Sequence, residues 1–521
     1  MTPPPAQVPP PARSASAAGA STPEIVDAVV VGGGVGGLVA ARTLAHRGLR
    51  VVVLESADRV GGPVRGGAFG ALPRLRLDLG AESFAARGTA VAELVAELGL
   101  DVVAPAPLSA WGYAAGRAFP LPAAGLLGIP SVPWAADVRR AIGWPGVARA
   151  ALDRLLPRFV ADTSDLGAFV RSRMGRRVTE RLVGPVAAGV HSAPLDRLDV
   201  AAVAPGLLDA FAAESSLSGA VASLRAAAPA GSAVRGIDGG IHALVEALTG
   251  EVAASAEEWV DSPRVDQTGP IHTAVRVAQR VTEVERLDAG PGGTWLVRTA
   301  AGSRVAAPRL VVTTPTVAPL LAPWLVDPGD DAVHGAADGA AVVVPAPERG
   351  ADVWLVTLLL DAPELDDAPR GSGMLVAPDE PAAGDGAGQG GEGVRAKALT
   401  HATAKWPWLA ERVRAAAGPG AHVVRLSYGR IGSSTVPPTA EEAARDASVL
   451  LGVDLTDRVR DHLLQRWDGA LPPPTPAYRA QVASFADAVG RTPGLAVTGG
   501  WVAGTGLAAV VAHAQAATED L

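Results

Sequence analysis

At roughly 150 residues per domain, a chain of 521 residues has room for about two to four compact domains. Its formal net charge of -8 at pH 7 argues against a nucleic-acid surface, which normally carries a basic stripe that neutralises phosphates. The absence of cysteine excludes disulfide bonds, thiolate metal sites and a cysteine nucleophile.

The first 22 residues are mainly Pro, Ala and Ser and lack the apolar block of a signal peptide, so we expect a disordered tail. Elsewhere the chain has no run of about 18 uninterrupted apolar residues, which argues against a membrane-spanning helix. We therefore expect a cytoplasmic protein, for which a peripheral contact with a membrane stays open.

The first structured segment predicts a strand, a turn, a helix and a second strand. Residues 25–31 form a short apolar run that ends in glycines, as a buried parallel strand does before a tight turn. Residues 38–48 show helical spacing and end at Gly48, which is a suitable helix stop. Residues 49–54 form a second apolar run that ends at Glu55.

The rest of the chain alternates between helical and strand patterns. Residues 107–230 are rich in Ala and Leu between Pro-containing loops and predict a mainly helical insertion. Residues 272–315 return to short strands, with antiparallel neighbours separated by turns. Residues 379–393 are too polar and Gly-rich to order, so we expect a loose surface loop. The C-terminal segment predicts a strand, a glycine-rich turn and a helix.

Gly32, Gly34 and Gly37 fit the G-x-G-x-x-G pattern directly after a strand and at the start of a helix. The first glycine permits the tight turn, the second lets a pyrophosphate approach the backbone, and the third lets helix and strand pack closely. Glu55 is placed to accept hydrogen bonds from the adenosine ribose. In so Gly-rich a chain the glycines alone would also suit an ordinary turn, but the strand, the helix and Glu55 favour a dinucleotide site.

Two following stretches, SADRVGGPVRG from Ser56 and LDLGAESF at 77–84, resemble the flavoprotein superfamily of monoamine oxidases, phytoene desaturases and porphyrinogen oxidases. Residues 238–244 are similar to the Gly-Gly-x-x-x-Leu helix of that superfamily, and Val281 matches a backbone contact to adenine. The C-terminal VTGGWVAGTGLAAVVAHAQAA resembles its closing flavin segment. The resemblance implies FAD, held without a covalent thioether because cysteine is absent.

The resemblance implies an α/β fold with α+β elements, in which a Rossmann-like FAD-binding domain is interrupted by substrate-binding and helical insertions. The expected divisions are a tail (1–22), FAD-binding parts (23–106, 231–320 and 481–521), a helical insertion and substrate region (107–230), and a substrate-binding domain (321–480). The expected cofactor-binding residues are Gly32, Gly33, Gly34, Val35, Gly36, Gly37, Glu55, Ser56, Arg59, Gly62, Gly80, Ala81, Glu82, Ser83, Val281, Trp467, Gly504, Thr505, Gly506 and Leu507.

Interior stretches resemble porphyrinogen oxidases, above all the bacterial coproporphyrinogen III oxidases. They are GRAFPLP (116–122), RLVGPVAAGVHSAP (181–194), GSGMLVAP (371–378), KALTHATAKWPW (397–408), VRLSYGRIG (424–432) and RWDGALP (466–472). The resemblance implies oxidation of coproporphyrinogen III to coproporphyrin III by O2, with release of H2O2, in haem biosynthesis.

Other interpretations stay open: a protoporphyrinogen IX oxidase, an amine oxidase or desaturase of the same superfamily, and a non-catalytic flavin-fold binding protein. The resemblance is compatible with a transient contact with ferrochelatase. The sequence indicates neither that contact nor an oligomeric state.

The chain departs from the family's pattern at two places. Tyr478 is displaced from the usual Pro-Gln-Tyr position, and the closing segment lacks an acidic residue after its Gly-Leu pair. Among the isolated residues, Trp406 and Trp408 are expected as core anchors, and the single His191 and His401 do not suggest a metal.

Arg117 is the candidate for binding a substrate carboxylate, although a solvated surface arginine is the stronger expectation for this residue type. No residue is an obvious acid–base catalyst.

Overall fold

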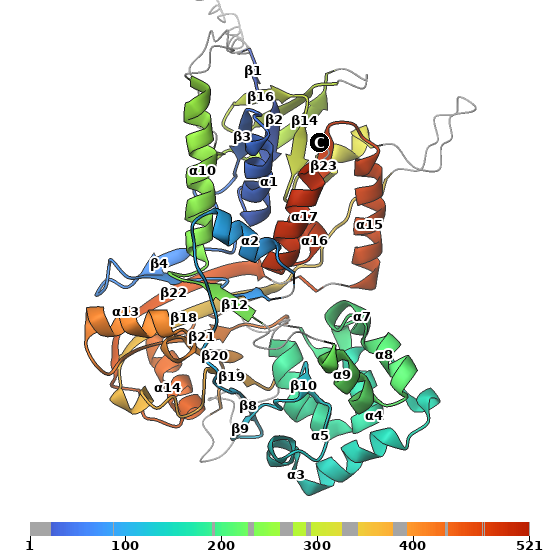
Figure 1. Cartoon of the computed structure of the whole chain (residues 1–521), viewed down its shortest axis with the longest axis vertical. Coiled ribbons are helices and arrows are strands. Elements are labelled where there is room, and N and C mark those ends of the chain that lie inside the picture. The colour runs from blue at the N-terminus through green and yellow to red at the C-terminus, as the bar shows by residue number, and fades with distance from the viewer. Residues whose placement is uncertain are drawn as a thin grey trace, which may run out of the picture.

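The computed structural model describes residues 22–86, 88–189, 193–227, 234–260, 275–287, 293–325, 342–378, 393–432, 436–470, 472–473, 475–519 and 521. These residues form three parts (Figure 1): a sheet-and-helix domain that contains both ends of the described chain, a second domain built on a large sheet, and a group of helices. The expected tail and the loop at 379–392 lie outside the described residues.

The centre of the first domain is a five-stranded parallel sheet. Its order is β13 (Val275–Arg276), β3 (Val51–Leu54), β2 (Ala28–Val31), β17 (Leu310–Val312) and β23 (Leu495–Val497). Every residue of β2, β3, β17 and β23 is buried. The strands are therefore continuous apolar runs, as expected for a parallel sheet covered on both faces.

The two faces of this sheet pack against different layers. Val29 and Val31 share a hydrophobic cluster with a four-stranded sheet that contains Trp295. That sheet has the order β1 (Glu24–Ile25), β16 (Arg304–Ala307), β15 (Trp295–Thr299) and β14 (Val281–Arg286), and its last three strands are antiparallel neighbours. Ala28 and Val30 instead face α1 (Val35–His46), which lies beside α10 (His242–Val260) and α17 (Leu507–Glu519).

The second domain is built on a seven-stranded sheet. Its order is β22 (Val459–Ala470), β18 (Ala351–Asp361), β21 (Ala421–Tyr428), β20 (Ala398–His401), β19 (Gly373–Val376), β8 (Ala110–Ala114) and β9 (Arg117–Pro120). One face packs on α14 (Ala440–Leu451). The other packs on the hairpin of β4 (Gly66–Ala68) and β5 (Arg76–Asp78), on α12 (Ala402–Lys405) and on α13 (Pro407–Ala417). Trp406 is buried in that second cluster and Trp408 packs at its edge.

Smaller elements connect the parts. A three-stranded sheet has the order β6 (Phe84–Ala85), β12 (Val234–Ile237) and β7 (Val102–Val103). The remaining helices of the first domain are α2 (Ala90–Glu97), α11 (Ala318–Leu321), α15 (Pro476–Gly490) and α16 (Gly500–Ala503).

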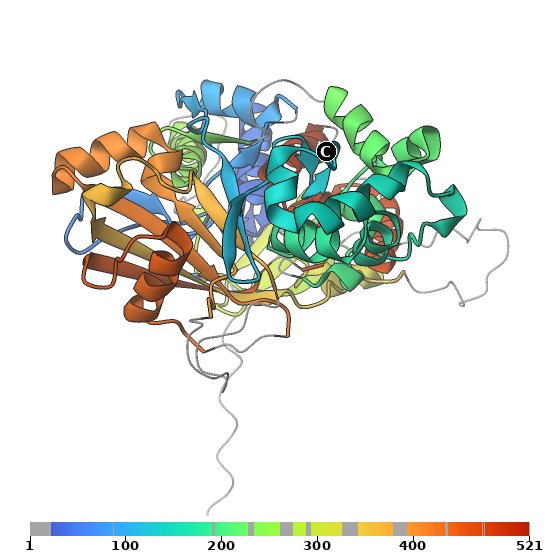
Figure 2. The same cartoon turned by 90° about the horizontal axis from the view of Figure 1, so that it is seen from below.

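The helices of the third part lie beside the seven-stranded sheet when the molecule is seen from below (Figure 2). They are α3 (Ala136–Ala151), α4 (Leu166–Met174), α5 (Arg176–Val178), the π-helix Thr179–Ala188, α7 (Val200–Val203), α8 (Leu207–Glu214) and α9 (Leu217–Ala226). The segment expected as mainly helical begins instead with strands, namely β8, β9, β10 (Gly125–Leu126) and β11 (Ile129–Pro130). Trp111, Tyr113 and Phe119 favour strand, and β8 is secured by its distant partner β19.

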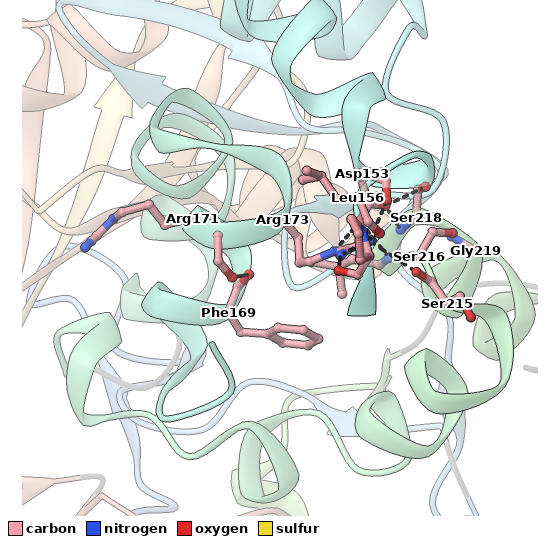
Figure 3. Close-up of polar contacts among 12 residues, drawn as sticks. Asp153, Leu156, Phe169, Arg171, Arg173, Ser215, Ser216, Ser218 and Gly219 are labelled. Atoms are coloured by element: carbon pink, nitrogen blue, oxygen red, sulfur yellow. Dashed lines mark hydrogen bonds and ion pairs between the residues drawn. The ribbon is translucent and has the colours of Figure 1, made fainter. Parts of the chain in front are cut away.

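A buried ion pair lies at the centre of the helical part (Figure 3). Arg173 Nε donates to Asp153 Oδ1 over 2.9 Å, and both side chains are fully buried. The carboxylate also accepts the main-chain N–H groups of Leu217 and Ser218 at 3.0 and 2.8 Å. The guanidinium also donates to main-chain carbonyl oxygens, including that of Pro157 at 2.8 Å. The charges are thus compensated by hydrogen bonds, which a buried pair requires to be tolerated.

Candidate cofactor site and the adjoining sheet

The glycine turn after β2 has two positions that admit no side chain. Gly32 has φ +106°, and a Cβ there would lie 2.3 Å from Thr313 Oγ1. A Cβ on Gly37 would lie 1.9 Å from the carbonyl oxygen of Gly32, so only glycine lets α1 pack this closely on the turn. Gly34 differs, because a Cβ there would meet no atom within 4 Å. Open space therefore lies where the G-x-G-x-x-G pattern predicts a pyrophosphate.

Glu55 braces this turn from the end of β3. Its Oε2 accepts the main-chain N–H of Gly33 at 2.7 Å, and its Oε1 accepts the N–H of Ala57 at 2.8 Å and the Ser56 hydroxyl at 3.2 Å. A carboxylate has about four lone-pair sites, so capacity remains for a ribose hydroxyl. The main-chain N–H of Gln279 donates to the carbonyl of Glu55 at 2.7 Å, which brings the start of β14, with Val281, to the same end of the sheet.

Two further loops complete a cradle around Gly34. A Cβ on Gly62 would lie 3.7 Å from Gly34 Cα, and a Cβ on Gly36 would lie 3.0 Å from Gly499 Cα. Gly504 and Gly506, which precede α17 and its first residue Leu507, face space with no atom within 4 Å of an added Cβ. The helices α1 and α17 both begin at this cradle. The N-terminus of a helix stabilises a bound anion through its free N–H groups and its dipole. The open glycines and helix ends together fit the pyrophosphate of a dinucleotide.

Arg59 braces the second loop of the cradle. Its guanidinium donates to the carbonyl oxygens of Val60, Gly62 and Val64 at 2.9, 2.7 and 3.4 Å. It also lies 5.6 Å from the centre of the Trp467 ring. Burial first, and the neighbouring charge of Arg65 second, lower the pKa of Arg59 from its ordinary value. In this structure Arg59 thus shapes the loop along which the resemblance places the pyrophosphate.

The loop at 78–83 lies as a layer between the cradle and the seven-stranded sheet. A Cβ on Gly80 would lie 1.8 Å from the carbonyl oxygen of Pro63 and 3.2 Å from Trp467 Cζ2, so this position admits no side chain. The main-chain N–H of Leu79 donates to the carbonyl of Arg65 at 2.8 Å. Movement of this loop would therefore be transmitted to the cradle.

Glu82 was predicted to bind the cofactor, but its carboxylate is held by two cations of the second domain. Oε1 lies 2.5 Å from Lys405 Nζ and Oε2 lies 2.7 Å from Arg425 Nη2. Burial alone would raise the pKa of Glu82, but the charges of Arg425 and Lys405 lower it below its ordinary value. The neighbouring Gly80, Ala81 and Ser83 remain on the loop beside the cradle.

Arg425 has a second role on the same loop. Its Nη1 donates to the carbonyl oxygens of Asp78 and Gly80 at 3.3 and 3.0 Å. A cavity of about 30 Å³ lies between Arg425, Glu82 and Trp408, which is room for about one water molecule and too little for an organic substrate.

Beyond Arg425, the same face of the sheet is less fully covered. Side chains alternate between the faces of a strand, so Ser427 lies on the same face as Arg425. A row crosses five strands through the cross-strand partners Leu355, Ser427, Ala398, Leu375 and Gly112. Its three central members are only half-buried although they lie on interior strands. A Cβ on Gly189, just past the π-helix, would lie 3.2 Å from Leu375 Cδ2, so this helix borders one end of the row.

The remaining predicted residues lie away from this centre. Arg117 begins the edge strand β9 and is exposed. His401 is buried with its Nε2 3.2 Å from His422 Nδ1, and the described residues contain no group of three or more potential metal ligands. His191 is outside the described residues. Within the described ranges no helix combines the length and apolarity needed to cross a membrane.

Sequence reasoning missed three contacts. Lys405 and Arg425 stand inside stretches that resemble porphyrinogen oxidases, but nothing local indicates Glu82 as their common partner. Tyr478, to which no role was assigned, donates its hydroxyl to the carbonyl oxygen of Trp501 at 2.8 Å. This contact ties α15 to the segment that closes the cradle.

Residues 35–335 match the family of flavin containing amine oxidoreductases, over more than half of the chain. The chain belongs to this family. The family confirms FAD as the cofactor and the mixed α/β fold that the sequence predicted.

Members of this family with curated functions match parts of the chain. The coproporphyrinogen III oxidase of Propionibacterium freudenreichii is 32% identical over 282 residues, which are 46% of this chain and 52% of that protein. The coproporphyrinogen III oxidase of Staphylococcus aureus is 27% identical over 194 residues, covering 36% and 41% of the two chains. The chain thus spans about half the length, or less, of these curated relatives.

Solved structures are similar over almost the whole chain. A protein from Exiguobacterium described as a protoporphyrinogen oxidase has a TM-score of 0.70 at 22% identity, covering 96% of this chain and 98% of its own. A putrescine oxidase has a TM-score of 0.57 at 14% identity, covering 96% and 99%. These likenesses establish the fold of the flavin amine oxidoreductases for all three parts of the molecule.

Proposed function

We propose that the protein oxidises coproporphyrinogen III to coproporphyrin III with O2 as the acceptor, releasing H2O2, in haem biosynthesis. The observation that carries the proposal is the match to coproporphyrinogen III oxidases of three bacteria at 27 to 32% identity. The order of the interior stretches that resemble those enzymes adds to it.

The reaction removes six electrons and six protons from the macrocycle, as three two-electron oxidations that each reduce one O2 to one H2O2. When bound, FAD supplies a two-electron acceptor that can be reoxidised by O2. The chain itself must bind the macrocycle, orient it and keep water away.

The row on the seven-stranded sheet is a suitable wall for a large, mainly apolar macrocycle. It consists of Leu355, Ser427, Ala398, Leu375 and Gly112, which present small or apolar groups and no ionisable side chain. A wall of this kind can contact the macrocycle over a large area and exclude water from it. It also agrees with the assignment of no acid–base catalyst, because the pyrrole N–H protons can leave to solvent.

Substrate preference distinguishes the two porphyrinogens. Coproporphyrinogen III carries two more carboxylates than protoporphyrinogen IX, and Arg117 is the residue proposed to meet one of them. A single charge-assisted contact contributes about 1.5 to 3 kcal/mol, enough for a preference of roughly tenfold to a hundredfold if it persists in the transition state. Arg117 is exposed and begins the edge strand β9. We therefore place its contact with a carboxylate at the rim of the substrate site and not at the centre of that site.

The test is an aerobic assay of the purified holoenzyme with both porphyrinogens, following porphyrin fluorescence and H2O2. We expect a higher kcat/KM for coproporphyrinogen III and three H2O2 for each porphyrin formed. Equal rates, or a preference for protoporphyrinogen IX, would refute the substrate while leaving a flavin oxidase. Turnover of an amine or a carotenoid without porphyrin formation would favour another branch of the family. If neither the porphyrinogens, nor an amine, nor a carotenoid bleaches the flavin, a non-catalytic binding protein would be favoured.

A peripheral contact with the cytoplasmic face of a membrane is part of the proposal. Between 134 and 160 the helical part exposes Trp134, Trp144, Leu155 and Phe159 to 49, 67, 80 and 87%. Arginines stack on both tryptophans, and apart from the buried Arg173–Asp153 pair, residues 134–181 contain nine arginines against four acidic residues in a chain of net charge -8. Aromatic and apolar groups set among cations suit an anionic lipid surface.

Co-sedimentation with vesicles tests this contact. The protein should bind vesicles that contain phosphatidylglycerol and release them in high salt, and Leu155→Ser with Phe159→Ser should weaken binding. Binding that is equal for neutral and anionic vesicles, or absent from both, would contradict it. A transient contact with ferrochelatase, which would take the product, rests on the resemblance alone.

A further inference from the structure

The loop at 78–83 is held from the second domain by side chains of three elements. Arg425 from β21 binds two of its carbonyl oxygens and the Glu82 carboxylate, and Lys405 from α12 binds the other oxygen of that carboxylate. Trp467 from β22 donates its indole N–H to the carbonyl of Leu79 at 2.9 Å. The side chains of Glu82, Lys405 and Arg425 are only 15, 17 and 13% exposed.

These contacts differ from the ion pairs on the surface of the same molecule. An exposed pair contributes little because solvent screens both charges. Around Glu82 the charges are mostly withdrawn from water, so removing one partner leaves the others without compensation. The arrangement also joins two domains, since Glu82 belongs to the loop beside the cradle and its partners to the second domain.

We infer that Glu82, Lys405 and Arg425 form an interdomain lock, in which they act as positioning residues that set the spacing between the cofactor cradle and the sheet row. The inference rests on the proposed function to the extent that the row is the substrate wall. Arg425 stands two residues from Ser427 of that row, on the same face. On the other side, the main-chain N–H of Leu79 donates to the carbonyl oxygen of Arg65 at 2.8 Å, which ties the loop to the cradle. A displacement of the loop therefore changes the distance between cofactor and row.

The lock is expected to act on the chemical step more than on binding. An error of about 1 Å in the placement of reacting groups can reduce a rate by roughly a hundredfold. A competing explanation is that the three charges act directly on the cofactor through their field. The two explanations predict different effects on the rate of flavin reduction. Glu82→Gln removes a negative charge and Lys405→Met removes a positive one, so a direct effect of charge would change the rate in opposite directions. Either substitution breaks the lock, so loss of positioning would lower the rate in both.

The experiment compares four variants of the FAD-loaded protein. Glu82→Gln and Lys405→Met break the lock, and Lys405→Arg keeps a cation that can bind Glu82. The matched control is Arg412→Gln, which breaks an exposed pair with Asp238 at 2.9 Å that also joins the two domains. The measurements are the anaerobic rate of flavin reduction by coproporphyrinogen III, kcat and KM per bound FAD, and the visible circular dichroism of the bound flavin without substrate.

We expect Glu82→Gln and Lys405→Met to lower the reduction rate alike, by about tenfold or more, with KM changed by less than about threefold. Lys405→Arg should recover most of the rate, and Arg412→Gln should stay within about twofold of the parent protein. Opposite changes in the two lock-breaking variants would overturn the lock in favour of a charge effect. A lower thermal stability or FAD content at an unchanged rate per bound FAD would also overturn it, because that pattern marks a purely structural role.

The circular dichroism separates this inference from the proposed function. If coproporphyrinogen III does not reduce the parent protein, the substrate proposal fails, and the lock is then judged on the flavin spectrum alone. The lock predicts the same change of the spectrum in Glu82→Gln and Lys405→Met, and the parent spectrum in Lys405→Arg and Arg412→Gln. A parent-like spectrum in both lock-breaking variants would contradict it.

Discussion

The indole N–H of Trp467 donates a 2.9 Å hydrogen bond to the carbonyl oxygen of Leu79. Trp467 lies on β22, at one edge of the seven-stranded sheet, and Leu79 follows the short strand β5 beside the cofactor cradle. This single bond joins residues that are far apart in the chain, and the same ring lies 5.6 Å from Arg59.

Replacing Trp467 by Phe should lower the free energy of unfolding by about 1 kcal/mol more than the same change at Trp408, because of these two tryptophans only Trp467 has a hydrogen-bond partner for its indole N–H among the described residues. The two positions are well matched, since an arginine stacks on each ring. Urea denaturation of the holoenzyme measures the difference. Equal destabilisation by the two substitutions would mean that the bond to Leu79 contributes nothing measurable.

Gly34→Val should weaken FAD binding by roughly a hundredfold or more, since a loss of about 3 kcal/mol suffices for that change. Gly34 has φ −70°, which any residue adopts, and its Cβ would meet no protein atom. The side chain would instead fill the space intended for the pyrophosphate, so the apoprotein should keep its stability. Titration of the apoprotein with FAD gives the affinity.

The control for Gly34→Val is Gly250→Val in α10, where an added Cβ also meets no atom. This variant should bind FAD with the affinity of the parent protein. Unchanged affinity in the Gly34→Val variant would show that the cofactor lies elsewhere.

Arg173→Met should lower the free energy of unfolding of the helical part by about 3 to 5 kcal/mol, because it leaves the fully buried Asp153 carboxylate without its cation. Removing an exposed arginine should have an effect below about 1 kcal/mol, as for Arg176→Met, which breaks the pair with Glu180 on the surface. Thermal unfolding of both variants provides the comparison. A similar shift in the two melting temperatures would contradict the assigned importance of the buried pair.

His401 should make the protein less stable in acid. Burial, assisted by His422, lowers the pKa of His401 to about 3 in the folded chain, from an ordinary value of 6.5. Between these two values the unfolded chain binds a proton that the folded chain does not, so stability falls as the pH decreases from 6.5 towards 3. The loss is at most roughly 1.4 kcal/mol for each pH unit.

The free energy of unfolding at pH 7.5 and pH 4.5 tests this dependence. His401→Phe should lose less stability between the two pH values than the parent protein, whereas substitution of the exposed His462 by Gln should leave the difference nearly unchanged. If His401→Phe shows the full acid sensitivity of the parent protein, other groups are responsible for it.

Local patterns were sufficient to predict the glycine turn and its flanking elements. The apolar runs at 25–31 and 49–54 predicted the strands observed at 28–31 and 51–54, and Glu55 follows the second strand as expected. These features depend on neighbours in the sequence, where burial and backbone conformation leave a direct signal. The structure adds that Glu55 also braces Gly33, a contact compatible with its predicted role.

Long-range pairings could not be predicted in the same way. Nothing in the residues of β8 indicates that it pairs in parallel with β19, and the strands at the start of the segment 107–230 were included in a helical prediction. Glu82 has the same difficulty, since its cations lie more than three hundred residues further along the chain. The resemblance predicted this loop as part of the cofactor region, but the side chain's partners follow from tertiary packing alone.

The position of β17 between β2 and β23 has a consequence for the order of events during synthesis. The parallel sheet takes two strands from the first 54 residues, two from the middle of the chain and its edge strand from Leu495–Val497. The cradle likewise includes a segment near the end of the chain, since a Cβ on Gly36 would lie 3.0 Å from Gly499 Cα. When most of this chain has been translated, β23 is still missing and the edge of β17 is unpaired. An unpaired sheet edge can pair with other chains, so the nascent domain needs protection from aggregation. If the C-terminal segment contacts the cofactor as predicted, we expect FAD to bind only after α17 has been synthesised.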